Sequence, residues 1–208
     1  MFIEQPPLLY RVLFPGAIWR IPSSKKCVYL TFDDGPIPEV TPWVLDELDR
    51  LDVKATFFCV GDNVRKYPDV YKMVLDRGHD VGNHTFNHIQ GLRYWTKNYM
   101  KNIRKAAELI KSKLYRPPHG HMRILQTLLL RRSYKIIMWD VVTRDYSPLL
   151  TPEEVFEVVK KYTRNGSIIV FHDSLKAEKN MKYAMPKAVE WLKAEGYEFK
   201  LLPKEWIK

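Results

Sequence analysis

Short apolar segments alternate with amphipathic helical patterns along the whole chain. The apolar segments are rich in β-branched and aromatic residues, and capping or turn-forming residues separate them from the helical patterns. We expect strands at residues 27–32, 55–60, 79–82, near Tyr115, 134–139, 167–171 and 198–202. Strands that alternate with helices are typical of βα units around a mostly parallel sheet. The pattern predicts an α/β fold of about seven strands in a single domain.

Capping residues place several helix boundaries. Thr41 and Pro42 form an N-cap and first-turn pair, and the sequence from Thr151 to Glu154 is a capping box that precedes a helix extending to Tyr162. A helix over residues 67–77 ends before Gly78, and Gly196 ends the last helix. These boundaries fall between the expected strands, as βα units require.

The length and composition are those of one soluble globular domain. The chain has 208 residues, of which 46% are hydrophobic and 28% charged. We expect residues 1–24 to form an N-terminal arm packed on a domain of residues 25–208. Residues 8–21 are apolar with two arginines, so a position on a membrane surface is the alternative, although Pro15 and Gly16 break any long helix.

The charge and the apolar runs bear on whether the chain binds nucleic acid or crosses a membrane. Lys and Arg exceed Asp and Glu by ten, but no nucleic-acid-binding module accompanies this charge, so we expect no nucleic-acid partner. No run of about 18 uncharged apolar residues occurs, so we expect no transmembrane segment. Six basic residues fall on one predicted amphipathic helix, where a charge run is usually the solvated face: Lys97, Lys101, Arg104, Lys105, Lys111 and Lys113.

The N-terminus and the two cysteines bear on the compartment. Glu4 and the pair Pro6-Pro7 interrupt the first ten residues, which therefore lack the pattern of a secretory signal. We expect a location in the cytoplasm or at the periphery of the cell envelope. Cys27 and Cys59 lie in predicted interior strands and are expected to be small buried thiols, since two such residues cannot form a metal cluster alone.

Polar residues follow most of the predicted strands. In parallel α/β folds the carboxyl ends of the strands meet at one edge, where catalytic residues gather. The residues expected there, in strand order, are Asp33 and Asp34, His84 and His88, Arg116, Asp140 and Asp145, and His172 and Asp173. This distribution predicts one polar site at the mouth of the sheet.

Two of these groups suggest a metal centre. Adjacent carboxylates at a strand end, such as Asp33 and Asp34, point in different directions and can serve different functions, although Asp-Gly-Pro is also ordinary turn chemistry. His84 and His88 are four residues apart, a spacing that a helical turn would place on one side, and that also occurs by chance. Two imidazoles and one carboxylate leave coordination positions open, as in catalytic sites.

Five motifs in this order resemble those of the polysaccharide deacetylases, the chitooligosaccharide deacetylase (NodB homology) domain of carbohydrate esterase family four. They are residues 31–35, 84–88, 116–120, Asp145-Tyr146 after Trp139, and 169–173. The matches span most of the chain, from the first predicted strand to beyond the sixth. The resemblance implies a deformed (β/α) barrel with a substrate groove over its mouth.

The resemblance also implies a role for each site residue. Asp34, His84 and His88 would bind one divalent metal ion, zinc before cobalt, nickel or manganese. Asp33 would be the general base, with Arg116 holding its carboxylate ionised. His172 would protonate the leaving amine and Asp145 would orient it. A backbone N–H near His119 would stabilise the oxyanion, and Tyr146 would line the substrate groove.

Three positions depart from the family pattern. His119 stands where Tyr or Phe is usual, Tyr146 where Trp is usual, and Val142 where a further Asp is common. These changes affect the walls of the groove and leave the expected metal ligands, base and acid in place. The implied function is metal-dependent removal of N-acetyl groups from an N-acetylated sugar polymer or oligosaccharide, peptidoglycan or chitin-like. The alternatives are hydrolysis of another amide, such as a cyclic imide, and non-catalytic glycan binding.

Overall fold

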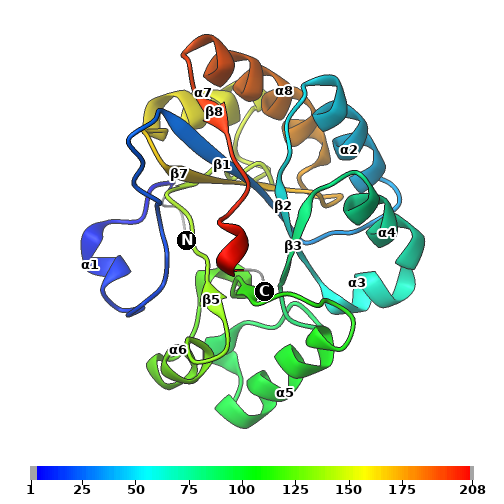
Figure 1. Ribbon diagram of the computed structural model, residues 1–208, viewed down its shortest axis with the longest axis vertical. Coiled ribbons are helices and arrows are strands. Elements are labelled where there is room, and N and C mark those ends of the chain that lie inside the picture. The colour runs from blue at the N-terminus through cyan, green and yellow to red at the C-terminus, as the bar shows by residue number, and fades with distance from the viewer. Residues whose placement is uncertain (1–3, 207–208) are drawn as a thin grey trace.

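The computed structural model describes residues 4–206 and contains one curled parallel sheet (Figure 1). Seven strands lie in the order β5-β4-β3-β2-β1-β7-β6, and β8 pairs with β1 beside this path. Every pairing between these strands is parallel, which confirms the predicted α/β barrel-like class. The strands are β1 (Cys27–Asp33), β2 (Thr56–Cys59), β3 (Asp80–Asn83), β4 (Leu114–Tyr115), β5 (Lys135–Ile136), β6 (Val141–Val142), β7 (Ser167–His172) and β8 (Glu198–Phe199).

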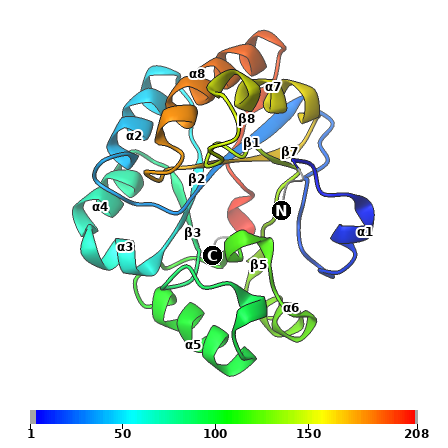
Figure 2. The same cartoon turned by 180° about the vertical axis from the view of Figure 1, so that it is seen from behind.

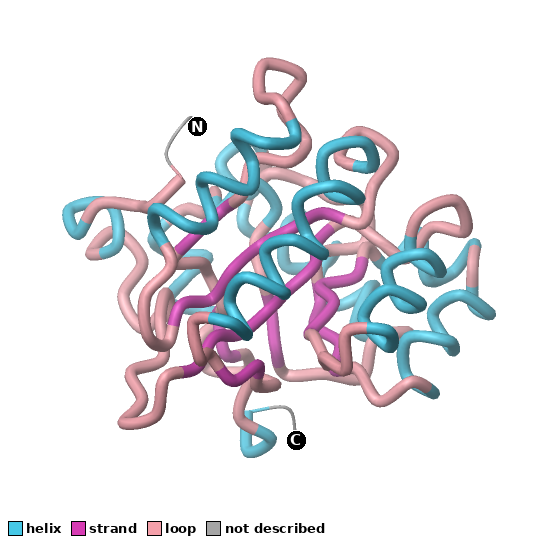
Figure 3. Tube along the Cα trace, turned by 90° about the horizontal axis from the view of Figure 1, so that it is seen from above, coloured by secondary structure: helices cyan, strands magenta, loops and turns pink. Residues whose placement is uncertain are grey.

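Helices surround this sheet on the outside, as the opposite views in Figures 1 and 2 show. Figure 3 shows the strands slanting through the interior between the helices. The helices are α1 (Leu8–Arg11), α2 (Thr41–Arg50), α3 (Gly61–Lys66), α4 (Pro68–Asp76), α5 (Thr96–Ala107), α6 (Ile124–Leu130), α7 (Pro152–Tyr162) and α8 (Glu178–Ala194). Short 3₁₀ turns form at Gly91–Arg93, Pro118–Gly120 and Lys204–Trp206.

The chain before β1 forms bridges to residues next to β5, at one end of the curled sheet, and to β7, near the other end. Ile18 forms a parallel bridge with Ile137, next to β5, and Arg20 forms an antiparallel bridge with Ser167 of β7. The backbone N–H of Ile18 donates to Ile136 at 2.8 Å, and that of Ile21 donates to Gly166 at 2.9 Å. The N-terminal segment therefore forms backbone hydrogen bonds with residues in β5 and next to β7.

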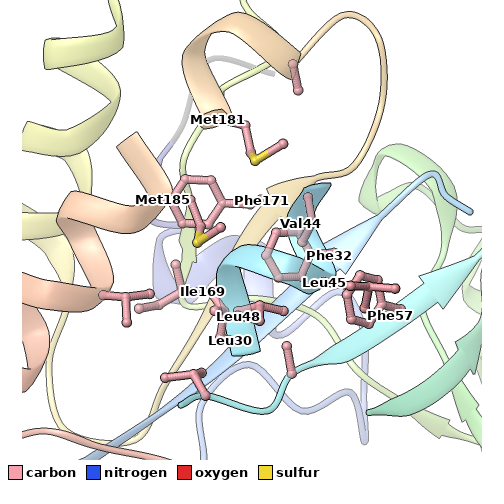
Figure 4. Packing of buried hydrophobic residues seen from close by; sticks show 14 of the residues in the cluster. Leu30, Phe32, Val44, Leu45, Leu48, Phe57, Ile169, Phe171, Met181 and Met185 are labelled. Carbon is pink, nitrogen blue, oxygen red and sulfur yellow. The ribbon is translucent and has the colours of Figure 1, made fainter. Parts of the chain in front are cut away.

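The largest buried cluster lies between the sheet and the helices α2 and α8 (Figure 4). Phe32 of β1 stacks on Phe57 of β2 with 5.0 Å between ring centroids. Leu45 and Leu48 cover these rings from α2, and the methionines of α8 pack from the other helix. The strands β1, β2 and β7 are buried along nearly their whole length, which explains why their sequences read as continuous apolar runs.

Three expected elements differ in the structure. The region 134–139 contains only the two-residue strand β5, and a separate strand β6 that the sequence did not predict follows at Val141–Val142. The helix α5 ends at Ala107, so Lys111 and Lys113 lie beyond it. Thr41 is not the N-cap of α2: its hydroxyl accepts from the N–H of Ile37 and donates to Asp173, so it serves the loop before the helix.

Two smaller predictions are confirmed. The Thr151 hydroxyl accepts from the N–H of Glu154 at 3.2 Å, and the Glu154 carboxylate accepts from the N–H of Thr151 at 2.8 Å, which is the expected capping box. Cys27 and Cys59 are buried free thiols.

Replacing Asp140 with Ala should lower the free energy of unfolding by about 3 kcal/mol, because it breaks a buried network. The fully buried Asp140 carboxylate accepts from Arg11 before β1, from Arg164 and from Ser167, each at 2.8 Å. Denaturant unfolding would measure the loss. The control is Asp49→Ala, which removes two ion pairs of a half-exposed surface carboxylate, with Lys54 and Arg77, and should cost no more than about 1 kcal/mol. Equal losses in the two variants would contradict a structural role for the network.

Candidate active site

A buried arginine fixes the first carboxylate of the site. Asp33 ends β1, and its Oδ1 lies 2.6 Å from Nη1 of Arg116, which follows β4. The fully buried Arg116 side chain also donates to the Thr31 hydroxyl and to the carbonyl groups of Ile137 and Met138. These contacts hold the guanidinium in one position, and its hydrogen bond to Oδ1 fixes the orientation of the Asp33 carboxylate. The expected pairing of Asp33 with Arg116 is therefore present.

The second carboxylate turns away from Arg116 and meets two histidines. Oδ1 of Asp34 lies 3.1 Å from Nε2 of His88 and 3.7 Å from Nε2 of His84. Ligand atoms of all three residues lie within 4.8 Å of one another, so they converge as the sequence predicted. The helical turn expected between the histidines is wrong, because residues 84–88 form a loop with positive φ at Thr85 and His88.

His84 and Asp34 are in the protonation states that a bound cation requires. Nδ1 of His84 lies 2.8 Å from the carbonyl oxygen of Arg116, so Nδ1 carries the proton and Nε2 presents a lone pair. Burial lowers the pKa of His84 to about 4, so the ring is neutral at pH 7. Burial alone would raise the pKa of Asp34, but the hydrogen bond with His88 and the nearby imidazoles lower it well below its usual range. The Nε2 lone pair of His84 and the ionised carboxylate of Asp34 face each other, and both are donors that divalent metal ions accept.

His172 pairs with the buried carboxylate of Asp145. It belongs to β7, which lies on the opposite side of β1 from the strand that precedes His84. His172 ends β7 and is the register partner of Asp33 on the neighbouring strand. Its Nδ1 lies 2.7 Å from Oδ1 of the fully buried Asp145, which also accepts from the backbone N–H of His172 at 2.8 Å. Burial alone would lower the pKa of His172, but the charge and hydrogen bond of Asp145 raise it to about 9.

These side chains open into one groove of about 810 Å³. Asp33, Asp34, His84, His88 and His172 line it, whereas Arg116 and Asp145 lie buried behind it. The walls include the positions that depart from the family pattern, His119, Val142 and Tyr146. The His119 ring lies 4.9 Å from that of His88, and the Tyr146 ring meets His172 edge to face at 4.8 Å. The nine residues to which the family resemblance gives a role therefore surround one cavity. The expectation that Asp140 lies at the same edge is wrong, because its carboxylate is bound by Arg11, Arg164 and Ser167.

Asp173, which the sequence places at the same strand end as His172, has a supporting role that the sequence did not predict. Its buried carboxylate accepts from the N–H of Gly35 at 3.0 Å and from the Thr41 hydroxyl at 2.6 Å, which anchors the loop after Asp34. A Cβ on Gly35 would lie 1.9 Å from this carboxylate, so only glycine fits there. Asn63 adds a hydrogen bond from its side-chain amide to the Asp34 carbonyl at 2.8 Å. The position of Asp173 directly after His172 was the available signal.

Comparisons with known proteins agree on one family. The profile of the polysaccharide deacetylase family matches residues 20–131. A peptidoglycan-N-acetylglucosamine deacetylase of Bacillus cereus is 31% identical over 190 residues, which cover 87% of this chain and 88% of the relative.

Solved structures give the same result. The structure of a peptidoglycan N-acetylglucosamine deacetylase in complex with 4-naphthalen-1-yl-N-oxidanyl-benzamide superposes with a TM-score of 0.87 at 30% identity over 95% of both chains. A mutant of a carbohydrate esterase family four pseudoenzyme, with restored enzymatic activity, superposes with a TM-score of 0.82 at 27% identity over 97% of this chain and 74% of the other. The motifs, the fold and these similarities together show that the chain belongs to the polysaccharide deacetylase family.

Proposed function

We propose that the protein is a metal-dependent hydrolase that removes the N-acetyl group from an N-acetylglucosamine unit of a peptidoglycan-like glycan and releases acetate and a free amine. The observation that carries this proposal is the convergence of Asp34, His84 and His88 in one groove with Asp33 and His172 beside them. The names of the relatives, which are peptidoglycan-N-acetylglucosamine deacetylases, support the choice of glycan.

The Asp34, His84 and His88 side chains would hold one divalent ion, with zinc as the first choice because two imidazoles and a carboxylate suit it. Such an ion would polarise the acetyl carbonyl and acidify the attacking water. Asp33 is not needed as a ligand, because its Oδ1 is engaged by Arg116. Asp33 accepts the proton of the attacking water, and Arg116 keeps its carboxylate pointed into the groove. A backbone N–H at His119 stabilises the oxyanion.

His172 supplies the proton that the departing amine needs. An amine is a poor leaving group unless it is protonated, and an imidazolium next to the groove provides the acid. Asp145 orients the ring through Nδ1, so Nε2 is the nitrogen free to face the substrate. The two proton-transferring groups, Asp33 and His172, end adjacent strands, which keeps them on a rigid frame.

The test is acetate release from defined N-acetylglucosamine oligosaccharides, with the protein stripped of metal and then supplied with Zn²⁺, Co²⁺, Ni²⁺ or Mn²⁺. We expect the stripped protein to lose nearly all activity and an added ion to restore it, because the donor set has no other means of acidifying water. Metal content measured on the same samples should approach one ion per chain.

A panel of substrates separates this proposal from the alternatives. Turnover of small cyclic imides without acetate release from any sugar would reassign the protein to another amide hydrolase. Binding of glycans with no acetate release at any metal loading would make it a glycan-binding protein. Full activity after metal removal would exclude the metal-dependent mechanism.

A further inference from the structure

Exposed apolar side chains gather on one part of the surface. Ten of the sixteen exposed large apolar side chains in the described part of the chain fall in three short segments, residues 8–13, 92–95 and 124–128. Leu9 of α1 is 79% exposed, Trp95 is 75% exposed and Leu125 of α6 is 57% exposed. We call these three segments the apolar face. An exposed concentration of this kind marks a binding surface more often than chance.

The three segments are contiguous in space. A shallow hollow of about 310 Å³ is lined by Leu13 from the first segment, Leu92 from the second and Ile124 from the third. The Arg123 guanidinium lies over the Trp95 ring at 5.3 Å, which joins the second segment to the start of α6. Figures 1 and 2 show α1 and α6 on the same side of the molecule in opposite views. The apolar face is therefore one surface.

The positive charge of the protein lies in the same region. Residues 84–139 contain twelve Lys and Arg and a single acidic residue, Glu108, whereas the rest of the chain has 22 basic and 23 acidic residues. Ten of the twelve are exposed, the exceptions being Arg116, which is buried, and Arg123, which is half-buried. Arg93 belongs to the second segment itself, and Arg131 and Arg132 directly follow α6, so exposed basic residues adjoin the apolar face.

From this combination we propose that the apolar face docks on the surface of an anionic lipid bilayer. Aliphatic side chains between basic ones insert at the boundary of head groups and acyl chains, while Lys and Arg meet the anionic head groups. A nucleic acid would gain nothing from exposed leucines. No helix within residues 4–206 is long and apolar enough to span a bilayer, so the contact would be peripheral.

Docking on this face would set the candidate active site beside the membrane. His121 lines both the hollow of the apolar face and the large groove that contains Asp33 and His172. The substrate reached in that position would be a glycan at the membrane surface. The docking proposal goes beyond the proposed hydrolysis and is tested by binding alone, so each can fail without the other.

Co-sedimentation of the full chain with vesicles tests the proposal. Phosphatidylcholine vesicles should bind weakly, and vesicles containing about one third phosphatidylglycerol should bind strongly, since basic residues are attracted to anionic head groups. The variant Leu9→Glu with Leu125→Glu should lower the partition coefficient at least about tenfold. The matched control is Leu75→Glu with Leu149→Glu, which makes the same change at exposed positions elsewhere and should bind like the parent.

A charge variant tests the second half of the proposal. Arg131 and Arg132 are exposed directly after α6, and the Arg131 side chain passes 3.7 Å from where a Cβ on Gly16 would lie, next to the first segment. Replacing both with Gln should lower binding to the anionic vesicles about tenfold and should not change binding to neutral ones.

Four results would overturn the proposal, of which the first three concern vesicles and the oligomeric state. These are failure of the parent to bind anionic vesicles, equal loss of binding in the Leu75 and Leu149 control, and a parent that forms a dimer broken by Leu9→Glu with Leu125→Glu and binds no vesicle. The last result would assign the face to a second copy of the chain. Binding of a DNA duplex that competes with vesicles and survives the leucine changes would assign it to nucleic acid.

Discussion

Replacing Asp33 with Asn should leave metal binding intact and lower acetate release by about 10²–10⁴-fold or more. Asn keeps the shape of the side chain and can still accept a hydrogen bond from Arg116, but it cannot take a proton from water. The measurement is the initial rate of acetate release, together with the metal content of the same protein. Arg116 loses its charged partner in this variant, which destabilises the fold. Thermal unfolding should therefore be measured, and we expect the variant to be folded at the assay temperature.

The neighbouring carboxylate provides the control. Asp34→Asn changes the next residue in the chain in the same way, but Asp34 faces His84 and His88 rather than Arg116. We expect this variant to lose metal as well as activity. If Asp33→Asn loses metal, the roles of the two carboxylates are exchanged. If Asp33→Asn retains full turnover, another group is the base.

Most of the fold follows from local patterns in the sequence. The buried strands β1, β2 and β7 carry long apolar runs, and caps such as that of Thr151 are decided by residues a few positions apart. The two-residue strand β6 was missed because its pairing depends on β7, which is distant in the chain. The bridge from Ile18 to Ile137 depends on tertiary contacts in the same way.

The sequence identified which residues form the site better than it predicted the backbone conformation that brings them together. The ordered motifs named the nine residues that surround one groove, whereas the strand-end rule also selected Asp140, which lies in a separate buried network. The spacing of His84 and His88 suggested a helical turn, yet the loop reaches the same convergence with positive φ at Thr85 and His88. Thr41 looked like a helix cap because its competing partner, Asp173, lies 132 positions away in the sequence. Rules that use only neighbouring residues cannot include a hydrogen-bond partner so distant in the sequence.

Fold similarity alone would not distinguish an active enzyme from an inactive relative. One superposable structure belongs to a mutant of a pseudoenzyme of the same family. Turnover in this chain therefore depends on particular side chains, Asp33 with Arg116 and His172 with Asp145. Each pair includes a buried charged group that is held by a specific hydrogen bond. Substitution of the acid tests this argument most directly.

Replacing His172 with Ala should lower acetate release by about 10²–10⁴-fold and leave the metal content unchanged, because His172 donates a proton and is not a ligand. Asp145 should stay in place in this variant, since it still accepts from the backbone N–H groups of residue 172 and Tyr146. An acetylated substrate with a better leaving group should recover part of the lost rate. Loss of metal would make His172 a ligand, and normal turnover would remove its role as the acid.

The pH profile gives an independent measure of the same role. The pKa of His172 is raised to about 9, so the ring is protonated at neutral pH and activity should fall as the pH rises through about 9. The change Asp145→Asn removes the charge that raises this pKa, and the fall should move towards the ordinary histidine value of about 6.5. A metal-loaded Asp145→Asn enzyme that keeps the parent's alkaline limit would show that a different group controls it. The parent's limit should be absent from the residual activity of His172→Ala, because that variant has no imidazole left to deprotonate.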